Sequence, residues 1–179
     1  MTQLAKKTGL VKGTLYLYFK TREELFLTLY EQSLMRWSQV FISHLSNAMT
    51  SRAYAQTLFT TAQADGAFLP LLIRLEHVIE HNVSIPRLIK SKQVFKQQVE
   101  TVAAPTSTSL SLNAAQATEV VKTMGVLLIG ATRSDQGPAL DNEALPSDVQ
   151  ALIASFASEP LFVKNAVRII EGIRAETGI

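Results

Sequence analysis

Apolar residues recur along most of this chain at intervals of three and four positions, which places them on one face of an α-helix. The strict alternation of apolar and polar residues that is typical of a half-buried strand is nearly absent. The pattern therefore predicts an all-α protein. The expected helices cover about residues 4–8, 12–18, 22–47, 54–64, 69–81, 86–103, 114–132, 147–157 and 161–175.

Several of these helices have recognisable ends. Gly9 follows the first short helix and suits the left-handed backbone that often terminates one. Thr21 is expected to cap the long helix, with Glu24 three residues later completing a capping box, and Asn113 is expected to cap the helix at 114–132. These residues indicate where the chain turns.

The long helix divides the chain into two parts. It joins a head, residues 1–46, to a body, residues 47–179, without a flexible linker. Within the body, the Ser- and Thr-rich stretch 104–112 and the Gly- and Pro-containing stretch 133–145 are expected to be loops.

Composition excludes several classes of protein. The chain has 179 residues, of which 47% are hydrophobic, and this is enough for a buried core. It contains no cysteine, which excludes disulfides, thiolate metal sites and cysteine nucleophiles. Its longest apolar run, residues 124–131, is too short to span a bilayer, and no secretory signal is apparent at the N-terminus. We therefore expect a cytoplasmic protein.

Charge is distributed unevenly. Residues 1–22 carry five basic and no acidic side chains, whereas residues 23–179 have a net charge of −3. A basic head on a mildly acidic body suits a protein that places one end against a polyanion, although chance clustering in so short a window is an equal alternative.

The head has the layout of a helix-turn-helix DNA-binding unit. Two short helices meet at Gly9, and the second carries Lys, Thr and Tyr instead of a fully apolar face. Lys12 and Thr14 are suited to base edges or phosphates, and Lys20 to phosphates. The alternative is that the aromatic residues form a buried cluster. The residues expected to contact DNA are Lys12, Thr14, Tyr16, Leu17, Tyr18, Lys20 and Arg22.

The head resembles the DNA-binding signature of TetR-type transcriptional regulators over about residues 1–30. The resemblance rests on Leu4, Ala5, Gly9, Leu10, Lys12, Gly13, Thr14, Leu15, Tyr16, Tyr18, Phe19, Arg22, Glu23 and Leu25. It implies an all-α homodimer whose body binds a small-molecule effector. It also implies that effector binding moves the two heads apart and releases operator DNA. We expect the effector to be apolar. The resemblance further implies that residues 11–18 form the recognition helix and that Arg22 contacts phosphate.

Two departures from the TetR pattern affect the head. Val11 stands where the family usually has a small polar N-cap, and the loss of that cap costs about 1 kcal/mol. Met1 falls at the start of the family's second helix, so the first head helix is expected to lie upstream or to have been lost. With that helix missing, weak DNA binding is expected.

The body is expected to hold an effector pocket and a dimer interface. Most of its aromatic residues have the spacing of core residues, and nothing in the sequence selects those that line a pocket. The pocket candidates are Trp37, Phe41, Phe59, Leu72, His77, Phe95 and Met124. Two apolar stripes suit a four-helix bundle around a two-fold axis, unless both face the chain's own core. The interface candidates are Val120, Met124, Leu127, Leu128, Ala131, Val163, Val167 and Ile170.

One further motif carries possible chemistry. His77, Glu80 and His81 match the letters of an inverted zinc-protease motif, but no third ligand is recognisable. We therefore expect no enzyme, no metal and no cofactor. Two alternatives to a DNA-binding regulator stay open: a helical protein that binds a ligand or partner without DNA, and, more remotely, a zinc hydrolase.

Overall fold

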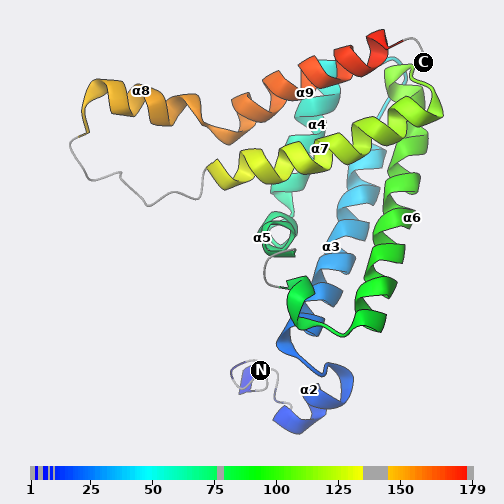
Figure 1. Ribbon diagram of the computed structural model, residues 1–179, viewed down its shortest axis with the longest axis vertical. Helices are drawn as coiled ribbons and strands as arrows, with labels where there is room; N and C mark the ends of the chain where they lie inside the picture. Colours follow the sequence, from blue (N-terminus) through cyan, green and yellow to red (C-terminus); the bar gives the residue numbers. More distant parts are fainter. Residues whose placement is uncertain are drawn as a thin grey trace.

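Every regular element among the described residues is a helix, which confirms the all-α prediction (Figure 1). The computed structural model describes residue 3, residues 6–7, residue 9 and residues 11–75, 79–134 and 145–176, with the backbone alone for Lys12 and Ser134. The helices are α2 (Lys12–Tyr18), α3 (Arg22–Ser43), α4 (Ser51–Ala64), α5 (Phe68–Arg74), the 3-10 helix η2 (Glu80–Asn82), α6 (Ile85–Leu110), α7 (Ala114–Ser134), α8 (Ser147–Ser155) and α9 (Ser158–Ala175).

Two long helices set the long axis of the molecule. Helices α3 and α6 run side by side, with α2 beyond the lower end of α3 and with α7 and α9 crossing at the other end (Figure 1). Helix α4 packs against α9, and α7 packs against both α6 and α9. Helix α8 projects away from this body and has no buried residue.

The core fills the space between these helices. Aromatic rings join three of them: Phe41 of α3 meets Tyr54 of α4 edge-on at 5.3 Å between centroids, and Phe59 of α4 meets Phe162 of α9 at 5.4 Å. All four rings are almost completely buried. Each such ring removes a large apolar area from water, so these contacts stabilise the crossing of α3, α4 and α9.

The two predicted helix caps, at Thr21 and Asn113, are confirmed. The Thr21 hydroxyl oxygen accepts a hydrogen bond from the Glu24 N–H at 3.1 Å, while the Glu24 carboxylate accepts one from the Lys20 N–H at 2.8 Å. Asn113 and Gln116 form a complete reciprocal cap, with bonds of 2.9 and 3.1 Å between each side chain and the other's N–H. These bonds satisfy N–H groups that have no partner inside the helix.

Two features of the head also agree with the sequence. Gly9 has a φ of 69°, the left-handed conformation that favours glycine over residues with a Cβ. Val11 is the N-cap of α2 and provides no side-chain hydrogen bond to it.

Several predicted boundaries differ from those of the structure. The stretch 104–112 is not a loop, because α6 continues through Pro105 to Leu110. The long helix ends at Ser43 instead of near residue 47. In the stretch 69–81 the α-helix ends at Arg74, and the described residues after it have π-helical or 3-10 backbone. Helix α7 also runs to Ser134, and residues 135–144 of the expected loop lie outside the described part.

Tertiary packing explains the extension of α6. Thr106 and Ser109 are buried, and the Thr106 hydroxyl is 2.8 Å from the Tyr54 hydroxyl of α4. The Ser107 hydroxyl donates to the Leu112 carbonyl at 2.6 Å, near the C-terminal end of the helix. These contacts override the weak preference of Ser and Thr for loops.

Candidate functional site

Helix α2 presents an exposed surface at one end of the molecule. Leu17 and Tyr18 are 85% and 78% exposed, and Tyr16 is 43% exposed. Leu15 on the opposite side is buried, and Thr14 and Phe19 are half-buried. The aromatic residues therefore do not form a wholly buried cluster, because one face of α2 packs inward and the other faces solvent.

The basic residues at the end of α2 differ in their surroundings. Lys20 is exposed. The Arg22 guanidinium lies 2.9 Å from the Glu23 carboxylate and 5.9 Å from the centre of the Phe26 ring. A phosphate approaching Arg22 would therefore compete with Glu23 for the same donors. The side chain of Lys12 lies outside the described part of the structure.

Helix α3 connects this surface to the body through several polar contacts. Thr21 donates from its hydroxyl to the Asn82 carbonyl of η2 at 3.2 Å. Arg87 of α6 holds both carboxylate oxygens of Glu31, at 2.7 and 2.8 Å, and the Thr28 hydroxyl at 3.1 Å. A bidentate pair with both partners mostly buried fixes orientation better than a single exposed ion pair. The start of α3 is thus tied to η2 and α6.

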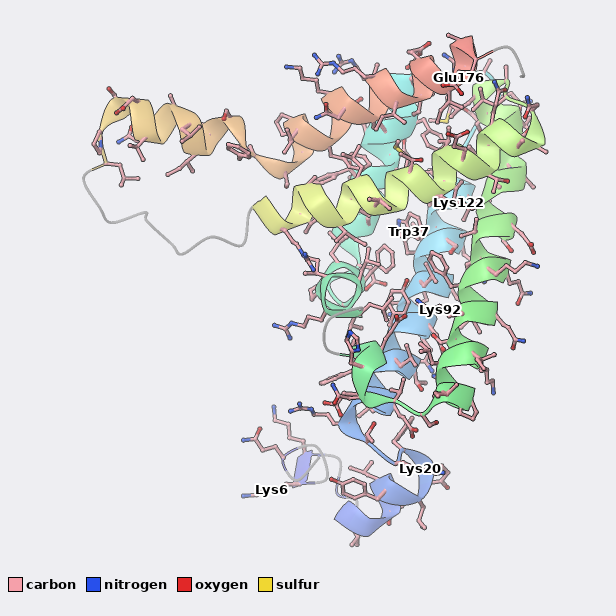
Figure 2. The ribbon with its side chains drawn as sticks, viewed as in Figure 1. Lys6, Lys20, Trp37, Lys92, Lys122 and Glu176 are labelled. Atoms are coloured by element: carbon pink, nitrogen blue, oxygen red, sulfur yellow. The ribbon has the colours of Figure 1, made fainter. Side chains whose placement is uncertain are left out.

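A largely apolar cavity of about 70 Å³ lies between α3, α4, α5, α6 and α7. This volume is enough for roughly five water molecules. Trp37 lies on α3 at its wall, and Lys122 lies where α7 crosses α6 (Figure 2). The cavity is lined by Tyr30, Leu34, Trp37, Ser38, Tyr54, Leu58, Phe68, Leu72, Phe95, Gln98, Val99, Val102, Val121, Lys122, Gly125 and Leu128.

Most polar atoms of the inner wall are already paired. The Tyr54 hydroxyl bonds Thr106, the Trp37 indole N–H donates to the Thr61 hydroxyl at 3.2 Å, and Ser38 donates to its own helix backbone. The Tyr30 hydroxyl is different, because it is buried and has no hydrogen-bond partner in the described part of the chain.

The two buried tyrosines stay protonated over the physiological range. Burial raises the pKa of Tyr30 above its ordinary value of 10.0, and the Glu80 and Glu31 carboxylates raise it further. Burial also raises the pKa of Tyr54, against the opposing effect of its hydrogen bond with Thr106. Each therefore presents a neutral O–H group.

Comparison with protein families identifies the family to which the chain belongs. Residues 1–29 match the model of bacterial regulatory proteins of the tetR family, and residues 31–177 match the tetracyclin repressor-like C-terminal domain. The chain belongs to the TetR family of transcriptional regulators. No curated protein is significantly similar to the chain. Within the described residues, no helix of this TetR protein is long and apolar enough to cross a membrane.

The structure separates the residues predicted for the TetR effector pocket. Trp37, Leu72 and Phe95 line the cavity. Phe41, Phe59 and Met124 do not line it and are buried in the core. His77 lies outside the described residues.

Sequence reasoning missed Tyr30, Gln98 and Lys122 as cavity residues. A search for apolar and aromatic residues at helical spacing overlooks polar residues on amphipathic helices. The four-residue spacing between Tyr30 and Leu34 places them on one face of α3 and was the available signal.

Most residues predicted for the TetR dimer interface lie in the chain's own core. Six of them have almost no exposed surface, so they cannot contact a second copy without leaving that core. They are Val120, Met124, Leu128, Ala131, Val163 and Ile170. Leu127 and Val167 are half-buried. Within the single chain, the apolar stripes therefore face inward for the most part, which is the alternative considered from the sequence.

Two of the three residues of the zinc motif lie in the described part of the structure. Glu80 and His81 belong to the 3-10 helix η2, and Glu80 forms a 2.7 Å ion pair with Lys92. No group of three His, Asp or Glu side chains suited to a metal is present among the described residues. Regulators of the TetR family are in general not enzymes.

Proposed function

We propose that this TetR regulator is a cytoplasmic repressor that binds a near-palindromic operator as a homodimer and is released by a small, mainly apolar effector. The observation that carries the proposal is that one helix, α3, serves both sites. It begins next to the exposed face of α2 and, eight residues after Arg22, contributes Tyr30 to the cavity wall. Eight residues of helix correspond to about 12 Å.

This arrangement supports a mechanical link between cavity and head. A ligand that fills the cavity contacts α3, α6 and α7 together, and α3 is tied to η2 and α6 by Thr21, Glu31 and Arg87. Two recognition helices must lie about 34–36 Å apart to enter successive major grooves. A ligand that favours another position of α3 therefore favours a dimer that does not fit DNA.

The DNA-binding part of the proposal predicts strong salt dependence. In an anisotropy titration, the full chain should bind DNA flanking its own gene, and affinity should fall steeply between about 50 and 200 mM salt. Lys20→Met should weaken binding to all sequences similarly and reduce the slope of log K against log salt by about 1, because one phosphate contact is lost.

Lys164→Met is the matched control for that titration, because Lys164 is exposed on α9, at the opposite end of the molecule from α2 (Figure 1). It should leave the slope unchanged. An unchanged slope in Lys20→Met would remove Lys20 from the interface. If the folded chain shows no specific binding to this DNA, the ligand-binding protein without DNA affinity becomes the better description.

The homodimer is proposed to use apolar surface that the single chain leaves exposed. Val126 on α7 is 72% exposed, and α8 exposes Leu152, Ile153 and Phe156 along one face. Contiguous exposed apolar side chains of this size mark interaction surfaces more often than not. Helix α8 has no buried residue and projects from the body, so a partner can reach it (Figure 1).

A charge on the apolar face of α8 should weaken the dimer. Leu152→Glu is expected to reduce dimerisation at least tenfold in sedimentation equilibrium, because a carboxylate would be buried without a partner, at a cost of about 1.4 kcal/mol or more. Ala154→Glu adds the same charge on the opposite face of α8 and should leave the dimer intact. Equal behaviour of the two variants would exclude α8 from the interface.

A further inference from the structure

The cavity is polarised along its length. At one end, Tyr30 lies in the field of the Glu80 and Glu31 carboxylates, which raises its pKa. At the other, Lys122 carries its ammonium group where α7 crosses α6, and Figure 2 shows it well separated from Lys92, the partner of Glu80. Lys122 has no carboxylate within ion-pair distance in the described part of the chain.

The space between these ends is narrow and apolar. Tyr30 and Ser38 both line it and are eight residues apart on α3, which corresponds to about 12 Å. Leu34, Val99 and Leu128 contribute aliphatic side chains along this length. The volume of about 70 Å³ holds only a slender group, so a larger ligand must extend toward the surface.

The rim near Lys122 is suited to the exposed part of such a ligand. Gln98 of α6 also lines the cavity and can donate a hydrogen bond from its side-chain amide. Gly125 lies one turn from Lys122 on α7, and a Cβ added there would meet nothing within 4 Å. The rim therefore offers one cation, one amide and open space.

We propose that the effector is a slender amphipathic anion, with its carboxylate on Lys122 and Gln98 and its apolar body directed toward Tyr30. This deepens, and rests on, the proposed effector function of the cavity. The reverse orientation would bring an anion toward Glu31 and Glu80, whose cationic partners Arg87 and Lys92 are already engaged, and would leave the ammonium of Lys122 beside an apolar tail. An ion pair at the exposed rim loses little hydration, whereas apolar groups gain free energy when they are buried against the inner wall.

Binding of three eight-carbon probes by the full chain tests this assignment. Octanoate, 1-octanol and octylamine share an apolar body and differ in the charge of the head group. Isothermal calorimetry gives their affinities, and emission from Trp37, the chain's single tryptophan, reports occupation of the cavity. Octanoate should bind at least fivefold more tightly than either of the other two.

Variants of Lys122 locate the charge that causes this preference. Lys122→Met should lower octanoate affinity at least fivefold and change 1-octanol affinity less than twofold. Lys122→Glu should make octylamine the preferred probe. Lys90→Met removes an exposed lysine of α6 that does not line the cavity and should change nothing. Gly125→Leu fills the open space on α7 and should abolish the Trp37 response to all three probes.

The outcomes distinguish this inference from the proposed function. Equal affinity for octanoate and 1-octanol, an unchanged preference in Lys122→Glu, or no binding of octanoate would each overturn the anion assignment, whatever the DNA titration gives. Octanoate binding with the expected Lys122 dependence, but without DNA binding, would support the anion site and reject the repressor.

Discussion

Replacing Phe59 with alanine should lower the free energy of unfolding by about 3–5 kcal/mol. Phe59 is almost completely buried, and its ring meets Phe162 of α9 at a centroid distance of 5.4 Å. The substitution removes the aromatic contact that joins α4 to α9 and leaves a cavity that the surrounding helices fill only in part. Urea unfolding monitored by circular dichroism measures the loss, and the melting temperature should fall by at least roughly 6 °C.

Phe95→Ala is the matched control for this substitution. Phe95 is 42% exposed at the cavity wall, so its truncation should change stability by no more than about 1 kcal/mol while weakening octanoate binding. Phe59→Ala should instead have the larger effect on stability and the smaller effect on octanoate binding. If the two variants lose the same stability, α4 and α9 are not packed through Phe59 in solution.

The contrast between these two phenylalanines shows why the pocket could be predicted only in part. Phe59 and Phe95 each stand at helical spacing among apolar residues, and a single helix pattern does not say which neighbour covers each ring. Burial depends on how α4, α6 and α9 cross, which involves contacts far apart in sequence. The sequence predicted both as pocket residues, and the structure places only Phe95 there.

The head was predicted more completely because its signals are local. The turn at Gly9, the cap at Thr21 and the bounds of α2 each depend on residues within four positions of one another. The interface candidates depend on tertiary structure in the same way as the pocket. The stripe containing Val120 and Met124 is a true helix face, but whether it meets the same chain or a second copy is a tertiary property.

Removal of one hydroxyl group should have opposite effects at the two buried tyrosines. Tyr54→Phe should reduce the free energy of unfolding by about 1–3 kcal/mol, because the Thr106 hydroxyl loses its 2.8 Å partner while remaining buried. Tyr30→Phe should raise it by about 1 kcal/mol, because it removes a buried hydroxyl that has no hydrogen-bond partner in the described structure. Urea midpoints at unchanged m-value measure both.

The two substitutions are each other's control, since they delete the same atom from similarly buried rings. A loss of stability in Tyr30→Phe would mean that this hydroxyl has a partner in solution, such as an ordered water. A gain would mean that the ligand-free protein keeps an unsatisfied polar group at the inner end of its cavity at a cost in stability. The other polar atoms of this wall are paired. A destabilising unpaired group among them is expected at a ligand-binding site, where function and not stability determines the residues.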